Sequence, residues 1–155
     1  MTQLLAIVVL VILGIVLTLA DPLNKGSKGM SAGLLNHGTA AAAYMYNGTS
    51  GGKTSYTVWC VDVGGVGCEK DVATESQPGV VLMGGGTDTD EAFLWQIEKA
   101  NGGDFVVLRA SGDDAYNQWI LDTSVAASMK LNSVRTILFK SAEASSDPVV
   151  LELIR

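Results

Sequence analysis

The stretch that decides the fold is Gly79–Asn117, GVVLMGGGTDTDEAFLWQIEKANGGDFVVLRASGDDAYN. It runs from an apolar segment through a glycine turn, a segment with helical periodicity and a Gly-Gly pair to a second apolar segment. Val80–Met83 and Phe105–Leu108 are continuous apolar runs, which is typical of strands covered by helices on both faces. Strands that alternate with helices through short loops predict parallel pairing with right-handed crossovers. The sequence therefore predicts an α/β domain.

The segment between the two apolar runs carries the signals of a helix. Thr87 or Asp88 can serve as N-cap, and Asp88 with Glu91 has the spacing of a capping box. Gly102 and Gly103 follow as a helix stop. One helical face collects the apolar residues Ala92, Phe93, Ile97 and Ala100.

The remaining residues extend the alternation to Arg155. A second helix is expected over Asp114–Lys130 and a third strand over Ser133–Phe139. A third helix is expected over Ala144–Arg155, with Pro148 near its first turn, where a missing N–H costs least. The residues expected to face inward from the second helix are Tyr116, Ile120 and Val125.

The first twenty residues contain the unbroken apolar run Leu4–Ala20, which we expect to be a hydrophobic helix. As a signal peptide it has a cleavage site at Thr18–Ala20, with small residues at the −3 and −1 positions. As a membrane anchor it lies at the short end of the roughly 17–25 residues that a spanning helix needs. Lys25 and Lys28 after the run would then leave the domain in the cytoplasm. Both interpretations remain open.

Residues 21–78 form a Gly-, Ala- and Ser-rich segment with little apolar periodicity, in which Tyr56–Val63 is the one predicted strand. Gly64–Gly67 is expected to turn the chain back to Cys68, so that a Cys60–Cys68 disulfide would close a hairpin and contribute about 2–3 kcal/mol. Two unpaired thiols are the alternative. Asn47 begins an N-glycosylation sequon. Sequon and disulfide favour a secreted or membrane-anchored extracellular protein over a cytoplasmic one.

The charge of the chain excludes nucleic acid as a partner. The net charge is −6, and the ten basic residues are scattered rather than clustered. One histidine and two cysteines cannot supply a closed tetrahedral metal site, so no metal is expected.

The glycine turn Gly84, Gly85 and Gly86 precedes a helix, where backbone N–H groups can bind anions. It fails the dinucleotide pattern because Thr89 stands where a third glycine is required, and it lacks the Gly-Lys-Ser/Thr ending of a P-loop. Nearby carboxylates would repel a phosphate. A tight turn between strand and helix is the better interpretation.

No catalytic residue can be assigned from the residues themselves. A hydrolytic triad needs an imidazole beside the nucleophile, and the one histidine, His37, lies in the low-complexity segment between Asn36 and Gly38. No GxSxG turn occurs in the chain.

Three segments, VVLMGGGTDTDEAF, GGDFVVLRASGDDAYN and NSVRTILF, resemble the cyanophycinase-like serine peptidases, relatives of dipeptidase E, over Gly79–Arg155. The resemblance implies a flavodoxin-like three-layer sandwich that hydrolyses peptide or isopeptide bonds next to acidic residues, without cofactor or metal. In that family the nucleophilic serine lies on a Gly-Thr-Ser-Ala-Gly turn beyond the segment that corresponds to Pro148–Arg155, and the histidine comes later still. We therefore expect an amino-terminal, catalytically incomplete part of such an enzyme.

The resemblance also implies a ligand-binding edge at the carboxyl ends of the strands. A peptide substrate is the expected partner once the missing half is supplied. Without later strands, an exposed sheet edge would invite self-association. Two alternatives stay open: a structural or filament subunit that assembles, or contacts a membrane, through Leu4–Ala20, and a non-catalytic module that binds basic peptides. The candidate edge residues are Gly84, Gly85, Gly86, Arg109, Ser111 and Asn117.

Overall fold

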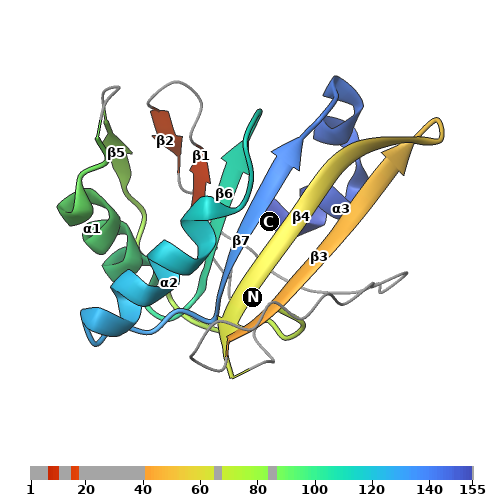
Figure 1. The fold of residues 1–155 in the computed structure, drawn as a ribbon. Helices are drawn as coiled ribbons and strands as arrows, with labels where there is room; N and C mark the ends of the chain where they lie inside the picture. The colour runs from red at the N-terminus through yellow and green to blue at the C-terminus, as the bar shows by residue number, and fades with distance from the viewer. Residues whose placement is uncertain (1–6, 11–14, 18–40, 65–67, 84–86, 155) are drawn as a thin grey trace.

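The structure, a computed structural model, describes residues 7–10, 15–17, 41–64, 68–83 and 87–154. It is a mixed α/β fold with parallel strand pairs (Figure 1). Its elements are β1 (Ile7–Leu10), β2 (Ile15–Leu17), β3 (Ala41–Ser50), β4 (Lys53–Val63), β5 (Val80–Leu82), α1 (Asp90–Ala100), β6 (Asp104–Arg109), α2 (Ala115–Ala126), β7 (Ser133–Phe139), a 3₁₀ helix η1 (Ala142–Ser146) and α3 (Pro148–Ile154).

The main sheet has five strands in the order β1-β6-β7-β4-β3. The β1–β6 and β6–β7 pairs are parallel, whereas β7–β4 and β4–β3 are antiparallel. Helices α1 and α2 cover the near face of the sheet in Figure 1, and α3 lies behind it. The parallel β6-α2-β7 unit is the crossover that the sequence predicts.

Helix α1 is confirmed, but its predicted cap is wrong. The N-cap is Thr89, without a side-chain hydrogen bond to the helix, and the Asp88 carboxylate accepts a hydrogen bond from Tyr116 instead. A tertiary partner therefore replaces the capping box. The helix ends as predicted, because Asn101 and Gly102 take positive φ angles of 48° and 86°.

Helix α2 is shorter than predicted, and one of its inward residues is wrong. Val125 is 58% exposed, whereas Ile120 is fully buried. The chain turns at Ser128, where φ is 58°, and Leu131 then returns to the core. The buried residues of α2 follow one helical stripe, Asn117, Ile120, Leu121 and Ser124.

The third predicted helix begins later than Ala144. Residues Ala142–Ser146 form η1, and α3 begins at Pro148, the position where a missing backbone N–H breaks no helical bond. Val150 and Ala144 are buried against the far face of the sheet.

The prediction that Val80–Met83 is a buried parallel strand is wrong. Strand β5 pairs antiparallel with β2 in a separate two-stranded sheet. Val80 and Leu82 are 60% and 74% exposed. The place beside β6 is occupied by β1, whose parallel pairing leaves no free edge there for β5.

The apolar run near the amino terminus is not a helix where it is described. Ile7–Leu10 and Ile15–Leu17 are strands, consistent with the preference of Ile and Val for strands. Among the parts of the chain that the structure describes, no helix has the length and apolar character needed to span a bilayer.

The predicted strand at Tyr56–Val63 is confirmed as part of β4, but its hairpin partner differs. The partner is β3, across a two-residue turn in which Gly51 and Gly52 have φ angles of 57° and 77°. Cys68 lies in a turn after β4 and is joined to Cys60 by the predicted disulfide.

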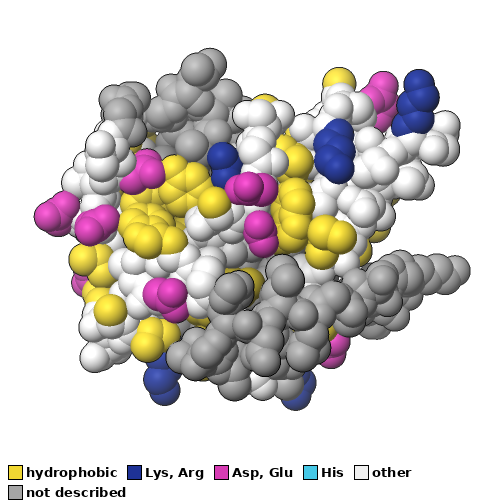
Figure 2. Space-filling model, viewed as in Figure 1, with side chains coloured by type: hydrophobic (Ala, Val, Ile, Leu, Met, Phe, Trp, Pro, Cys, Tyr) yellow, Lys and Arg dark blue, Asp and Glu magenta, His cyan; other side chains and the backbone are white. Residues whose placement is uncertain are grey.

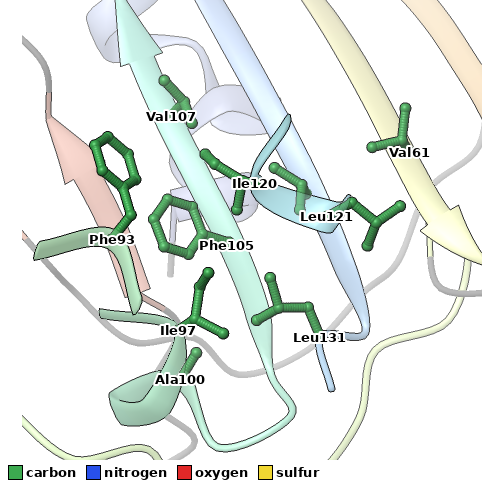
Figure 3. Packing of buried hydrophobic residues seen from close by; sticks show 10 residues of the cluster. Val61, Phe93, Ile97, Ala100, Phe105, Val107, Ile120, Leu121 and Leu131 are labelled. Atoms are coloured by element: carbon green, nitrogen blue, oxygen red, sulfur yellow. The ribbon is translucent and has the colours of Figure 1, made fainter. Parts of the chain in front are cut away.

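The core has one layer on each face of the main sheet. The far layer contains Tyr56, Val58, Val106, Leu108, Ile137, Ala144 and Val150. In the near layer, drawn in Figure 3, the Phe105 side chain lies among Phe93, Ile97 and Ile120. The two layers hold β6 and β7 rigidly and so fix the position of the turn that follows β6.

Candidate functional site

The turn after β6 is built around the Arg109 side chain. Arg109 Nη1 donates to the Asp113 carbonyl oxygen at 2.8 Å, and the guanidinium lies 5.3 Å from the centre of the Tyr116 ring. Gly112 has φ 90°, and a Cβ at this position would lie 2.6 Å from Arg109 Nη2. The turn therefore needs a glycine for its backbone conformation, and a side chain here would also displace the Arg109 guanidinium.

Two loops that are distant in sequence meet beside this turn. The Tyr116 hydroxyl donates a hydrogen bond of 2.5 Å to Asp88 Oδ2, which joins the start of α2 to the residues before α1. This hydrogen bond is the main reason why the pKa of Tyr116 is raised, and partial burial adds to it. The phenol is therefore a neutral donor across the physiological range, held by the Asp88 carboxylate.

A cluster of aromatic side chains packs next to the Tyr116–Asp88 pair. Trp119 packs edge-on against Phe93 at 4.7 Å between ring centres and against Tyr116 at 6.0 Å. Asp88, Ala115, Tyr116 and Trp119 line an open hollow of about 230 Å³. In Figure 2, hydrophobic side chains gather on the face formed by α1 and α2, and acidic side chains lie around them.

At the carboxyl end of β6, aromatic side chains, carboxylates and one guanidinium thus lie close together. Arg109 faces Asp113 at 3.9 Å, and the Asp113 side chain is 70% exposed, so this ion pair is weak and open to exchange. A guanidinium with an exposed partner can bind an incoming carboxylate in its place.

Hydrolytic chemistry is not assembled in the described part of the chain. Ser111 is exposed in the Arg109 turn, and the one histidine, His37, lies outside the described residues. The described residues also contain no group of three or more His, Cys, Asp or Glu side chains that could hold a metal ion.

Asn117, a candidate edge residue, lies in the interior. Its Nδ2 donates to the Trp59 carbonyl oxygen at 3.2 Å, and its Oδ1 accepts from the Thr136 hydroxyl at 2.6 Å. The side chain is 1% exposed. Asn117 therefore ties α2 to β4 and β7 and is not presented to a ligand.

The other candidates are spread over the molecule. Gly84, Gly85 and Gly86 lie outside the described residues. Asn47 lies exposed on β3, and its Oδ1 accepts a hydrogen bond of 2.5 Å from the Thr57 hydroxyl. Cys60 and Cys68 are joined in a disulfide, at the opposite end of β4 from the turn to β3.

Sequence reasoning missed the hollow, although its residues carry a signal. Tyr116 and Trp119 are three residues apart and so share a helical face. Asp88 belongs to the loop after an apolar run, where α/β folds bind ligands. The hydrogen bond between these two segments cannot be read from either segment alone.

Comparison with known proteins adds no assignment. No family model matches the chain, and neither the curated proteins nor the solved structures contain a significant match.

Proposed function

We propose that the α/β part of this chain is the amino-terminal, substrate-binding part of a cyanophycinase-like serine peptidase domain, catalytically incomplete by itself. The observation that carries the proposal is the contact between Asp88 and Tyr116. These residues come from the two longer segments that resemble the family, and they meet beside Arg109 at the carboxyl end of β6. A flavodoxin-like three-layer arrangement is part of the proposal, supported by the β6-α2-β7 crossover and by helices on both faces of the sheet.

In this function the edge binds a peptide and does not cleave it. The Arg109 guanidinium exchanges its weak contact with Asp113 for a carboxylate of the peptide. The faces of Tyr116 and Trp119 contact the apolar part of the peptide. Cleavage requires a nucleophilic serine and a histidine that takes its proton, which the missing half would supply.

Binding and turnover by the purified chain test the proposal together. An aspartyl dipeptide should bind without being hydrolysed, and Arg109→Gln should abolish the binding. Lys99→Gln is the matched control, because Lys99 also lies over an aromatic ring, that of Trp95 at 5.5 Å, but on α1 away from the edge. Hydrolysis by this chain alone, blocked by a serine reagent, would contradict the incomplete site. Absence of dipeptide binding would contradict the proposal that the carboxyl end of β6 binds a peptide.

The reading frame after the Arg155 codon tests the family assignment separately. An open frame that encodes a Gly-Thr-Ser-Ala-Gly turn is expected within it. A frame that encodes an unrelated domain would contradict the assignment.

A second candidate is a non-catalytic module that binds basic peptides. The observation in its favour is the hollow lined by Asp88, Tyr116 and Trp119, since carboxylates and aromatic faces both attract cations. Tight binding of a lysine-rich peptide, with no binding of aspartyl dipeptides, would favour it. A filament or membrane role for Leu4–Ala20 draws no support from the strands found there.

A secreted or membrane-anchored extracellular location remains part of the proposal. Its support is the Cys60–Cys68 disulfide, a bond that persists in oxidising compartments.

A further inference from the structure

A row of buried polar side chains crosses the main sheet at the end opposite to the Arg109 turn. Asp62 on β4, Ser133 on β7 and Asp104 on β6 are register neighbours, and each is at most 8% exposed. The Ser133 hydroxyl donates to Asp104 Oδ1, and Asn132 Nδ2 donates to the same oxygen at 2.9 Å. Two carboxylates thus lie buried in one row, which we call the carboxylate row. Burying carboxylates is costly unless their partners are held in place.

Residues Cys68–Asp71, the cover segment, close this row through main-chain contacts. The Cys68 N–H donates to Asp62 Oδ2 at 2.9 Å. Arg135 Nη2 donates to the Cys68 carbonyl oxygen at 3.1 Å, and Asn132 Nδ2 donates to the Lys70 carbonyl oxygen at 2.9 Å. Cys68 therefore holds both Asp62 and Arg135.

One covalent bond fixes Cys68 in this position. The disulfide joins it to Cys60 on β4, and the register partner of Cys60 on β7 is Arg135. Cys60 is 4% exposed, whereas Cys68 is half-buried. The bond thus joins a buried cysteine of the sheet to a half-buried cysteine of the cover segment.

We propose that the Cys60–Cys68 disulfide is a redox latch that keeps the cover segment closed over the carboxylate row. A dithiol reductant supplies the two electrons. One of its thiolates attacks Cys68 Sγ, the S–S bond breaks, and Cys60 leaves as a thiolate. The second thiol of the reductant then attacks the mixed disulfide, forms the reductant's own disulfide and releases Cys68. Each protein thiolate takes up a proton from solvent, which leaves two thiols.

Opening of the latch changes the surroundings of the Asp104 carboxyl, whose pKa is shifted in the closed form. Burial raises the pKa of Asp104, Arg135 and the hydrogen bonds from Ser133 and Asn132 partly oppose this rise, and Asp71 adds to it. A raised folded pKa means that stability is greatest below the ordinary value of 3.8 and falls as pH rises through the folded pKa. In the reduced protein, water reaches Asp104, and this fall becomes smaller. The stability advantage of the oxidised form is therefore larger at pH 4 than at pH 7.

Hydrogen exchange on the full chain, oxidised and after treatment with dithiothreitol, tests the latch. Loss of the hydrogen bond to the Asp62 carboxylate predicts that the Cys68 amide exchanges about 10-fold to 100-fold faster after reduction. Peptides from β6 and β7 should keep their protection, and reoxidation should restore the slow exchange. Arg135→Gln, with the disulfide intact, should show an intermediate rate in the cover segment.

Three results would overturn the proposal. The first is unchanged exchange of Cys68–Asp71 after reduction, and the second is unfolding of the whole chain, which would make the bond a requirement for folding. The third is an oxidised-minus-reduced difference in stability that does not vary between pH 4 and pH 7, as expected of a bond with no link to the carboxylate row. Cys60→Ser with Cys68→Ser should reproduce the reduced behaviour. If that variant does not fold, the wild-type reduction decides.

Discussion

Strands β5 and β6 have almost the same sequence pattern and opposite environments. Each is a run of Val and Leu that precedes a turn and a helix. Strand β6 lies between two parallel neighbours and is buried along its length, whereas β5 has one antiparallel neighbour and two exposed side chains. An apolar run therefore predicts that a strand forms, and the available partner edges decide where it lies.

The first prediction has the largest expected effect and compares how much each strand contributes to the free energy of unfolding. Phe105→Ala removes a fully buried ring that stacks on Phe93 at 6.5 Å, and it should lower the free energy of unfolding by about 3–5 kcal/mol. Leu82→Ala, at a side chain that is 74% exposed, should change it by less than about 0.5 kcal/mol. Urea unfolding measures both. Equal losses would mean that β5 is buried as deeply as β6.

The second prediction concerns the contact that joins α2 to β7, the neighbour of β6, and to β4. Asn117→Ala leaves the Trp59 carbonyl and the Thr136 hydroxyl without their partner and should cost about 2–3 kcal/mol. Gln118→Ala, one residue on, removes only an exposed hydrogen bond to Asp122 and should cost about 0.5 kcal/mol or less. A small loss of unfolding free energy in Asn117→Ala would show that the packing of α2 does not depend on these hydrogen bonds.

The third prediction addresses the turn that follows β6. Gly112→Ala should cost about 1–2 kcal/mol because φ is positive, and it should also displace Arg109. Gly51→Ala has a positive φ with no atom nearby, so it should cost a similar amount without affecting Arg109. Peptide binding separates the two, since only Gly112→Ala should weaken it. Equal peptide binding by both variants would show that Arg109 does not contact the peptide.

The fourth prediction has the smallest expected effect. It concerns the hydrogen bond between Asp88, in the loop after β5, and Tyr116 on α2. Asp88→Asn removes the negative charge that keeps the Tyr116 phenol protonated, so the pKa of Tyr116 should fall toward its ordinary value of 10.0. Ultraviolet titration of phenolate measures it. Asp90→Asn is the control and should leave the Tyr116 titration unchanged. No shift in Asp88→Asn would show that the Asp88 contact is absent in solution.

The sequence predicts helices and strands well where the pattern of neighbouring residues is enough to determine them. Helix α1, strand β6 and strand β7 follow from apolar periodicity and glycine stops, and they are confirmed.

Other features depend on partners that are distant in sequence. Strand β3 has weak strand formers, and it forms because β4 pairs with it and because Gly48 leaves room for the Tyr56 ring. The family resemblance places Asn117 at the ligand-binding edge, yet its side-chain amide bonds to the Trp59 carbonyl oxygen and the Thr136 hydroxyl. Such contacts are set by the packing of three strands and one helix, and no single segment encodes them.

The measurement that tests the central claim most directly is a set of nuclear Overhauser contacts between strand amides in the labelled chain. The account predicts contacts between Phe105 and Val134 and between Val81 and Val16, with none between Val81 and Val106. Contacts between Val81 and Val106 would place β5 beside β6 in one parallel sheet, and they would contradict the separation of the two strands.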